Sequence, residues 1–560
     1  MLLQAFVSIV AGLTHAASIA APWSGEPQWW LQLLAMGALV WQLQSADSPR
    51  QAAWRGWLFT TAWLCGTFWW LFISLHTYGG LPAAITVLAI FGLAAALALY
   101  YAGACYVFRH MAVENRTLSA TLFAALWMMA EMARGTWLTG FGWGAAGYAH
   151  LDSLAVYAKY VGAYGLAGLA AFVAASLALW LVERRRDALL QLGPRWHALG
   201  SLKTLAPVAL IALLALVTDR EFTSPAGTLH VALLQGNIKQ SEKFEPSTGI
   251  ADALTWYGEQ MTNSKAALVV APETAIPLLP NQLPQDYWAR VSAPFRQAGQ
   301  AGQAGQAGPS DGPNSGQSSG PSGGPGQALL VGIPLGSFAD GYTNSVVGVK
   351  PGPPSNAPPA PTDAYRYDKH HLVPFGEFIP PLFKWFTQMM NIPLGDFNRG
   401  AVGQPSFEWQ GQRLAPNICY EDLFGEELAA RFLDPAKAPT IFVNISNIGW
   451  FGNTLAIDQH RNISRMRALE FERPFIRATN TGDTVIINHR GQVTQALPRH
   501  TRGVLSGQVE GRAGSAAVGA GVTPFAAWVA RFGLIPIWLF SSFIIVFIYI
   551  LSRKTSKNTI

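Results

Sequence analysis

The chain is 560 residues long; 50% of these residues are hydrophobic and only 12% are charged. Soluble globular proteins carry about 25% charged residues, so this composition excludes a disordered chain and argues against a single soluble domain. The formal net charge is +6, and the 21 Trp and 30 Phe residues are typical of a protein that meets the lipid interface.

Apolar runs long enough to span a bilayer, roughly 20 residues each, cluster in the first 220 residues. We predict seven of them, at about 3–21, 28–44, 56–75, 82–107, 119–138, 158–182 and 203–218. An eighth run, 533–551, lies in a C-terminal segment, 524–553, that we also place in the membrane. The predicted fold is therefore an α-helical membrane bundle of eight spans, seven of them in 1–220, with a folded domain over 226–512.

The Lys and Arg residues are distributed regularly among the connections. The connections after the second, fourth and sixth runs contain them, as does the segment after the eighth, whereas those after the first, third and fifth contain none. By the positive-inside rule, both termini lie in the cytoplasm and the large domain lies outside. The excess of Lys and Arg is thus explained by their role in setting the membrane orientation, and no nucleic-acid partner is expected. The N-terminus lacks the charged n-region of a signal peptide, so the first run is interpreted as a span.

Between the seventh and eighth runs, short apolar segments alternate with Gly and Pro. We predict strands at 229–236, 266–272, 328–333, 343–350, 413–418, 439–445 and 475–481, with a helix at 454–472. Several strands are apolar throughout, as expected of strands buried on both faces. The low-complexity stretches near 297–327 and 351–361 are interpreted as surface insertions. This pattern predicts a layered α/β domain.

Two reactive side chains stand out in this domain. Glu273 ends a buried strand in LVVAPETAIP, although an acid in a surface turn would fit equally well. Lys369 belongs to YRYDKHHLVPFGEFIP, a dense group of chemically useful side chains, although such a lysine is usually part of a solvated loop. The adjacent His370 and His371 point in different directions, so we expect them to orient this loop rather than to bind a metal.

Cys419 lies where a strand runs into a helical pattern, in NICYEDLF. The N–H groups of a helix N-terminus favour both a thiolate and an oxyanion. A buried structural cysteine is the alternative. Cys65 and Cys105 lie within predicted spans and are interpreted as packing residues; three scattered cysteines exclude a disulfide framework or a metal cluster.

The segments LLQGNIKQ, APETAIP, YDKHHLVPFGEFIP, NICYEDLF and NISNIGWFG, in this order, resemble the carbon–nitrogen hydrolase (nitrilase) superfamily. This resemblance implies an α-β-β-α sandwich and a Glu–Lys–Cys triad. Glu273 would be the general base, Lys369 the oxyanion and orientation residue, and Cys419 the nucleophile. The flanking spans narrow the resemblance to the membrane-bound N-acyltransferases that complete bacterial lipoprotein maturation.

The resemblance implies further site residues. Glu377 matches the second acid of the family, in the PFGE motif, and Tyr420 and Glu421 complete its CYE trio. Aromatic side chains are expected to contact the substrate, namely Trp450, Phe451, Phe378 and Phe244. Phe244 departs from the family, in which Trp is common at this position. The apolar loop 375–390 is expected either to shield the site and dip into lipid or to pack on the core.

The activity implied by the resemblance is acyl transfer. The acyl donor would be a phospholipid, the intermediate a thioester on Cys419, and the acceptor the N-terminal amine of S-diacylglyceryl-cysteine on an apolipoprotein. A membrane-tethered amidase that uses water is the rival. We expect a monomeric, multi-pass protein of the bacterial inner membrane with a periplasmic catalytic domain, and no cofactor or metal.

Two ionisable residues fall near the end of the fifth predicted span. Glu131 and Arg134 are three positions apart, so they can pair on one helix face. A structural ion pair is one interpretation, and contact with a phospholipid headgroup is the other.

Overall fold

The computed structural model describes residues 2–189, 194–296, 326–337, 339–352, 360–379 and 397–557. Most of the two low-complexity stretches predicted near 297–327 and 351–361 lies outside these residues. The second half of the apolar loop, 380–390, also lies outside them.

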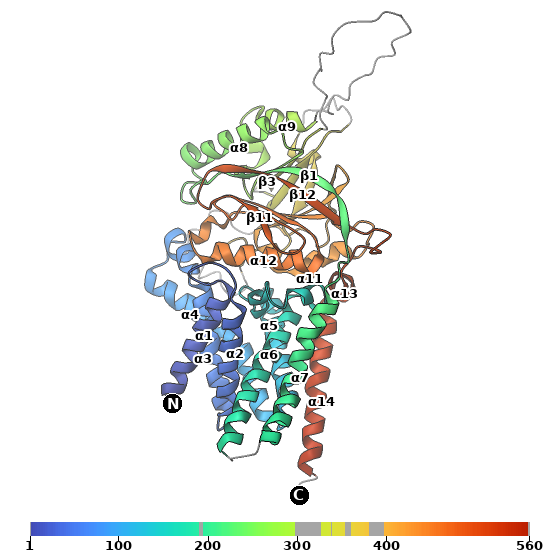
Figure 1. Ribbon diagram of the computed structural model, residues 1–560. Coiled ribbons are helices and arrows are strands. Elements are labelled where there is room, and N and C mark those ends of the chain that lie inside the picture. The colour runs from blue at the N-terminus through green and yellow to red at the C-terminus, as the bar shows by residue number, and fades with distance from the viewer. Residues whose placement is uncertain are drawn as a thin grey trace, which may run out of the picture.

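Long helices from the first part of the chain, together with the last helix, form a bundle beneath a folded domain (Figure 1). They are α1 (Leu2–Ile19), α2 (Trp29–Gln44), α3 (Pro49–Phe68), α4 (Ala83–Met111), α5 (Arg116–Thr136), α6 (Ala158–Leu189), α7 (Pro194–Thr218) and α14 (Ile535–Lys557). Many large apolar side chains of α1, α4, α7 and α14 point outward and are exposed. Such an apolar exterior suits lipid rather than water.

Four helices among the described residues are long and apolar enough to cross a membrane: Leu2–Ile19, Ala83–Met111, Ala155–Arg185 and Ile535–Arg553. The prediction of eight such spans is therefore confirmed only in part. The helix α2 has only 16 residues, while α3 and α5 bury polar and charged side chains that lower their hydropathy. The apolar part of α7, Thr204–Thr218, is short as well.

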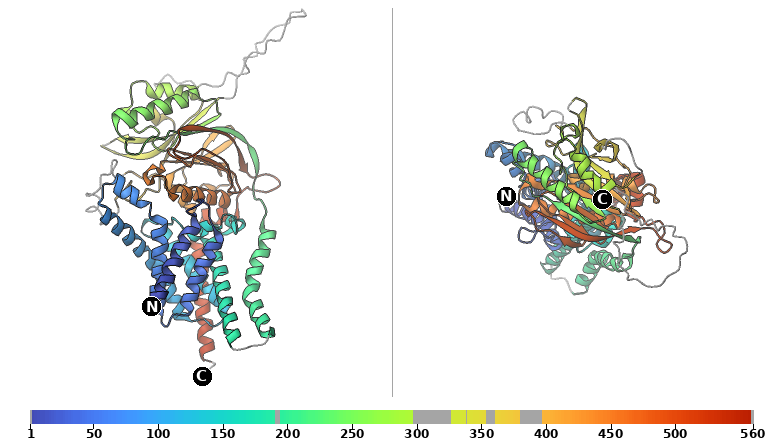
Figure 2. Two further views of the ribbon diagram at one scale, coloured as in Figure 1. Left: turned by 60° about the vertical axis from the view of Figure 1, so that its left-hand side comes forward. Right: turned by 90° about the horizontal axis from the view of Figure 1, so that it is seen from above.

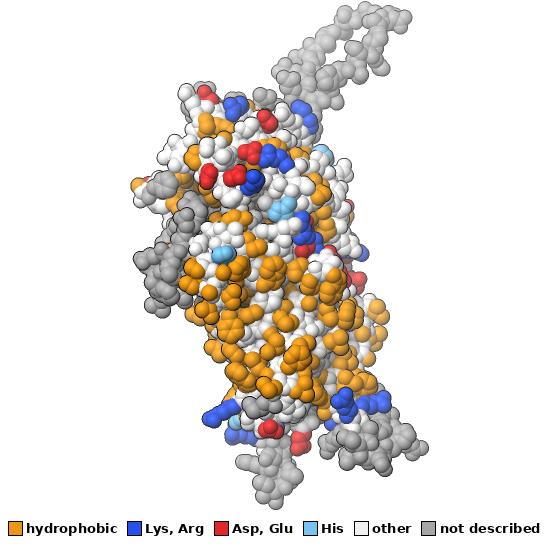
Figure 3. Space-filling view, turned by 90° about the vertical axis from the view of Figure 1, so that its left-hand side faces the viewer, with side chains coloured by type: hydrophobic (Ala, Val, Ile, Leu, Met, Phe, Trp, Pro, Cys, Tyr) orange, Lys and Arg blue, Asp and Glu red, His pale blue; other side chains and the backbone are white. Residues whose placement is uncertain are grey.

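Lys and Arg side chains lie at the end of the bundle away from the domain (Figure 3). Figure 3 shows a broad apolar belt with Lys and Arg side chains below it. At this end Arg109 Nε donates to Ala46 O at 2.7 Å, and Arg116 pairs with Glu183. The connections that carry the basic residues therefore lie together, as the charge alternation in the sequence predicts.

The folded domain contains two six-stranded sheets. The first has the order β12-β1-β2-β3-β4-β5 and the second β11-β10-β9-β8-β7-β6. The first consists of β1 (Ser224–Gln235), β2 (Leu268–Val270), β3 (Ala328–Ser337), β4 (Gly341–Val349), β5 (Tyr365–Asp368) and β12 (Gly503–Ala513). The second consists of β6 (Phe407–Trp409), β7 (Gln412–Ile418), β8 (Ile441–Ser446), β9 (Phe475–Thr479), β10 (Val485–Ile487) and β11 (Val493–Ala496). In each sheet the three central strands are parallel and the outer pairs antiparallel.

Helices cover both outer faces of the paired sheets. An apolar core from β1–β3 and β7–β9 fills the space between the sheets. The helices α8 (Ala251–Asn263) and α9 (Tyr287–Arg296) pack on the first sheet, and α11 (Gly425–Ala429) and α12 (Leu455–Phe471) on the second. Figures 1 and 2 show α12 lying between the second sheet and the bundle. The expected α-β-β-α sandwich is confirmed.

The seven predicted strands and the predicted helix all correspond to observed elements, but five strands were not predicted. The strands β5, β6, β10 and β11 have three or four residues each, too few for a periodic signal. The edge strand β12 buries only alternate residues of a Gly-rich sequence, so it lacks the apolar run of the central strands.

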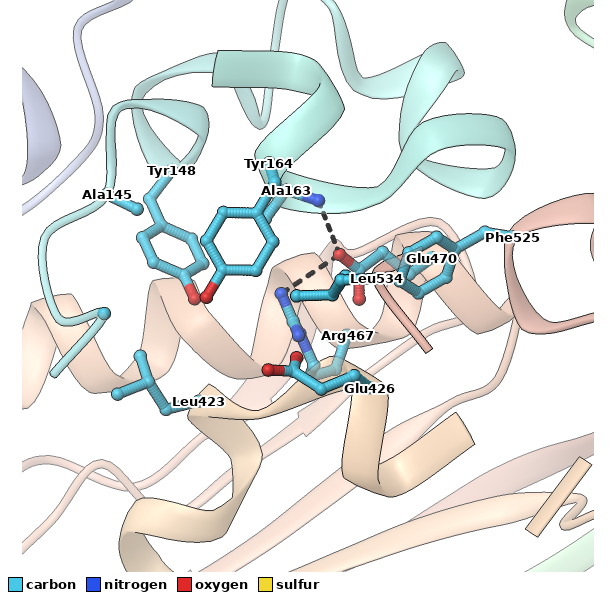
Figure 4. A pocket seen from close by; sticks show the side chains of 11 residues that line it. Ala145, Tyr148, Ala163, Tyr164, Leu423, Glu426, Arg467, Glu470, Phe525 and Leu534 are labelled. Atoms are coloured by element: carbon cyan, nitrogen blue, oxygen red, sulfur yellow. Dashed lines mark hydrogen bonds and ion pairs between the residues drawn. The ribbon is translucent and has the colours of Figure 1, made fainter. Parts of the chain in front are cut away.

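The domain is attached to the bundle by buried polar contacts. The indole N–H groups of Trp70 and Trp143 both donate to Gln459 Oε1 on α12, at 2.9 and 2.7 Å. In Figure 4, Glu470 joins α12 to the start of α6, because its Oε1 accepts from Ala163 N at 2.7 Å and from Arg467 at 3.0 Å. The small cavity beside them has only about 10 Å³ of free volume. The contact around Glu470 is therefore nearly close-packed.

Glu131 and Arg134 form a structural ion pair. Both side chains are 0% exposed, and Arg134 Nη2 lies 3.0 Å from Glu131 Oε2. Arg134 also donates to Tyr101 Oη and to the carbonyls of Phe141 and Trp143. Because these partners satisfy the pair inside the protein, the interpretation as a headgroup contact is wrong.

Arg134→Met should cost about 3–5 kcal/mol of stability, because it leaves the Glu131 carboxylate buried without a counter-charge. Adding Glu131→Gln should recover part of this loss. The apparent melting temperature in detergent measures both effects. Arg116→Met, at the half-buried pair with Glu183, is the matched control and should cost less than about 1 kcal/mol. Equal losses at the two sites would contradict this account.

Candidate functional site

The three residues of the expected triad come together at the ends of strands from both sheets. Glu273 follows β2, Lys369 follows β5 and Cys419 follows β7. Lys369 Nζ lies 3.5 Å from Glu273 Oε1. The thiol of Cys419 is close enough to interact electrostatically with both side chains, and Ser446 lies beside it. The carboxyl ends of strands from both sheets therefore assemble the site.

Close packing of the backbone positions Glu273. A Cβ atom on Gly332 of β3 would lie 2.4 Å from Pro272 O and 2.7 Å from Glu273 Cα. Only glycine therefore lets the segment after β2 approach β3 so closely.

Cys419 starts a 3₁₀ turn, Cys419–Leu423, where the sequence suggested the start of a helix. Its φ of +52° lies in the left-handed region, which is rare for a side chain of this kind. Its carbonyl accepts from Asn444 Nδ2 and also lies 3.1 Å from His460 Nε2. Strained backbone held by such contacts is typical of functional residues.

Lys369 is shared by two carboxylates. Its ammonium is 1% exposed and lies 2.8 Å from Glu377 Oε1, closer than to Glu273. The side-chain amide of Asn344 donates to both acids, at 2.6 Å to Glu273 Oε1 and 2.9 Å to Glu377 Oε1. The second oxygen of Glu377 accepts from Val373 N at 2.8 Å, within the same loop. Glu377 thus holds the lysine in place beside Glu273.

These contacts decide the charge on Glu273. Burial alone would raise the pKa of Glu273, but Lys369, the Asn344 amide and Lys243 together hold that pKa below its ordinary value. The Asn447 N–H adds a hydrogen bond of 2.8 Å to Oε2. Burial likewise opposes the charge on Lys369, but the two carboxylates raise its pKa above the ordinary value. The resting site therefore contains an ionised base and an ionised ammonium.

The thiol beside them stays protonated. Burial raises the pKa of Cys419 to about 12, the Glu273 charge contributes to this rise, and Lys369 offsets only part of it. The sequence suggested that a helix N-terminus would favour the thiolate, but the neighbouring carboxylate and the short turn oppose that effect. The arrangement thus pairs a carboxylate base with a neutral thiol that it can activate.

Tyr420 and Glu421 support the site rather than point at the triad. Glu421 Oε2 accepts from Tyr367 Oη and Ile418 N, and Oε1 accepts from His370 N. It therefore joins the Lys369 loop to the Cys419 turn. Tyr420 Oη donates to the Gly140 carbonyl in the loop after α5, which anchors the turn to the bundle.

Of the four residues expected to contact substrate, two lie against the bundle. The rings of Trp450 and Tyr78 are 5.7 Å apart, and Phe451 is 4.4 Å from Trp70. Phe378 packs against the Arg399 guanidinium.

The remaining one, Phe244, adjoins Lys243, whose side chain is 2% exposed and donates to Glu273 O at 3.2 Å. Burial lowers the pKa of Lys243 to about 7.

Sequence reasoning missed Asn344, Asn447, Ser446 and Lys243. Ser446 ends β8 and Asn447 follows it at the same sheet edge as Cys419, so their strand-end position was an available signal. Asn344 and Lys243 carried no such signal. Among the described residues, no group of three or more His, Cys, Asp or Glu side chains is placed to hold a metal ion.

Two family models match the chain. One, described as the apolipoprotein N-acyltransferase N-terminal domain, matches residues 15–176, and the other, described as carbon–nitrogen hydrolase, matches residues 230–517. Among solved structures, the carbon–nitrogen hydrolase from Helicobacter pylori G27 is 14% identical with a TM-score of 0.33, covering 51% of this chain and 90% of that one.

Relatives that match this chain over most of their length are named apolipoprotein N-acyltransferases. The apolipoprotein N-acyltransferase of Verminephrobacter eiseniae is 54% identical over 541 residues, which cover 94% of this chain and 92% of that protein. The apolipoprotein N-acyltransferase of Ralstonia nicotianae is 41% identical over 518 residues, covering 90% and 89%. The chain therefore belongs to the apolipoprotein N-acyltransferase family, and it is a bacterial membrane protein with a carbon–nitrogen hydrolase domain.

Proposed function

We propose that the chain transfers an acyl group from a phospholipid, through a thioester on Cys419, to the N-terminal amine of an S-diacylglyceryl-cysteine on an apolipoprotein. The observation that carries this proposal is the ionised Glu273 carboxylate held by Lys369 beside the neutral Cys419 thiol. The chain's family membership supplies the substrate classes. One chain contributes all of these side chains, so we propose that it acts as a monomer.

In the first half-reaction, Glu273 accepts the thiol proton while Cys419 Sγ attacks the ester carbonyl. The Lys369 ammonium and backbone N–H groups stabilise the oxyanion, a contribution worth about 3–4 kcal/mol per donor. The C–O bond then breaks, and the leaving alkoxide takes the proton from Glu273. The products are a lysophospholipid and the thioester.

In the second half-reaction, the neutral amine of the acceptor attacks the thioester carbonyl. Glu273 accepts the amine proton and returns it to the sulfur as the C–S bond breaks. An N-terminal amine has a pKa of about 8, so roughly a tenth is neutral at pH 7 and ready to attack. The cycle ends with an amide and a free Cys419 thiol.

We further propose that the bundle lies in the bacterial inner membrane with the catalytic domain on the periplasmic side and both termini in the cytoplasm. The clustering of Lys and Arg at the end of the bundle away from the domain supports this orientation. Trp450 and Phe451 then lie at the level where the domain meets the outer leaflet, against Tyr78 and Trp70 of the bundle. Lipid substrates would approach the site from there.

Purified protein given phospholipid should gain one acyl mass on Cys419, because the thioester forms before the acceptor binds. Cys419→Ala should lose this adduct completely while keeping the melting temperature of the parent protein. Intact-mass analysis with peptide mapping measures it, and Cys105→Ala, in the bundle, is the matched control. Adding a diacylglyceryl lipopeptide should discharge the adduct as acylated peptide; discharge into water at the same rate without acylated peptide would establish the amidase instead.

Glu273→Gln should separate the two roles of that carboxylate. Loss of the base should slow acylation of Cys419 by phospholipid by about 10²–10⁴-fold. Loss of the negative charge should lower the pKa of the thiol from about 12, so alkylation by iodoacetamide at pH 8 should become faster. In the parent protein, alkylation should rise with pH through pH 10 without reaching a plateau. Slower alkylation in the variant would contradict the proposed electrostatic role.

Lys243→Met should shift the acid limb of the acylation profile to higher pH, by up to about one unit. The lysine is a buried positive neighbour that lowers the pKa of Glu273, and without it the base protonates at higher pH. The initial rate of adduct formation from pH 4 to 8 measures the shift. Lys239→Met, at an exposed lysine of the same segment, should leave the profile unchanged. If the acid limb of the acylation profile did not shift in Lys243→Met, that lysine would not influence the pKa of Glu273.

A further inference from the structure

A groove outside the catalytic residues runs along the junction of bundle and domain. It has about 620 Å³ of free volume, within the range of pockets that bind small molecules. Its lining comes from α1, α3, the loop after α1 and the start of α12. Glu273, Lys369 and Cys419 are not part of this lining.

Small apolar residues line the membrane side of the groove. Ala16, Ala17 and Ala20 of α1 line it, with Gly66 of α3. A Cβ atom on Gly66 would lie 2.9 Å from Ala16 Cβ, so the two helices touch here and form a closed floor. Water is a poor occupant of such a surface at membrane depth.

Two tryptophans place the groove at the membrane interface. Trp23 and Trp69 both line it, and their side chains are 68% and 45% exposed. Exposed tryptophan is enriched where lipid headgroups meet acyl chains. The groove therefore opens toward lipid at headgroup level.

The domain side of the groove is polar and charged. Asp458 and Arg499 line it together with Asn453 and Thr454. Both Nη atoms of Arg499 bond to the Asp458 carboxylate, at 2.5 and 3.1 Å. The Nε–H of Arg499 takes part in no hydrogen bond among the described residues, and the side chain is 31% exposed. A guanidinium fixed in this way presents a free donor edge to an anionic group.

We propose that this groove binds a glycerophospholipid as a second, non-catalytic lipid site. One acyl chain lies on the α1–α3 floor, and the phosphate lies against Arg499. Such a lipid would bridge the bundle and α12 next to Gln459, which lines the groove and accepts the indole N–H groups of Trp70 and Trp143. A bound lipid would therefore strengthen the attachment of the domain to the bundle.

The test uses Cys419→Ala protein in phosphatidylcholine nanodiscs, so that no acyl transfer occurs and the result does not depend on the proposed function. The probe is a phosphatidylethanolamine with a diazirine on its acyl chain. After irradiation, peptides covering 13–25 should be labelled at least about fivefold more than lipid-facing peptides of α14. Equal labelling would overturn the proposal, and this comparison needs no groove variant.

Filling the groove tests the same site. Ala17→Trp should reduce labelling of 13–25 by about fivefold or more, because the indole occupies the floor. Ala212→Trp, on the exposed face of α7, is the matched control and should leave labelling unchanged. Unchanged labelling in Ala17→Trp would overturn the site.

Two further probes identify the lipid. They carry the same diazirine chain on diacylglycerol or on a free fatty acid, and both should label 13–25 much less than the phospholipid does. Equal labelling by diacylglycerol would overturn the role of the phosphate. Equal labelling by the fatty acid would overturn the phospholipid and show that the groove binds a single-chain amphiphile.

Discussion

The whole site depends on burying one ammonium group. Lys369 is almost completely removed from water, which costs several kcal/mol unless carboxylates and hydrogen bonds compensate. Glu377 at 2.8 Å and Glu273 at 3.5 Å provide that compensation, with Asn344 joining the two acids. The ends of β2 and β5 and the loop that carries Glu377 must therefore meet before this lysine can be buried. The same constraint gives the site its chemistry, because the buried cation keeps Glu273 ionised next to a neutral thiol.

The second constraint is the attachment of the domain to the bundle. The helix α12 lies between the second sheet and the membrane helices, and Gln459 on it accepts from Trp70 and Trp143. The Cys419 turn is held from the same side, because Tyr420 donates to the Gly140 carbonyl. The nucleophile is therefore fixed relative to the membrane helices as well as to its own sheet, so a substrate that stays in the lipid meets it in a defined geometry.

Sequence reasoning succeeded where one side chain carries a strong signal. Glu273, Lys369 and Cys419 each stand next to apolar strands or a dense motif, and the central strands are continuous apolar runs. It failed where the signal lies in tertiary structure. Asn344 is a neutral amide inside a strand, Lys243 stands in an ordinary polar stretch, and edge strands such as β12 are half exposed. The count of eight spans exceeded the four apolar helices because helices packed inside a bundle tolerate polar residues such as Glu131.

The charge balance of the site also bears on the choice between amine and water. Burial and the Glu273 charge raise the pKa of Cys419 to about 12, while Lys369 holds the pKa of Glu273 below its ordinary value. Complete proton transfer before attack is therefore unfavourable, so the transfer must accompany attack on the ester. A carboxylate of such low basicity is a still poorer base for water, whose pKa is 15.7. An amine needs no base before it attacks, and its proton becomes acidic once the N–C bond forms. A neutral amine therefore places a smaller demand on Glu273 than water does.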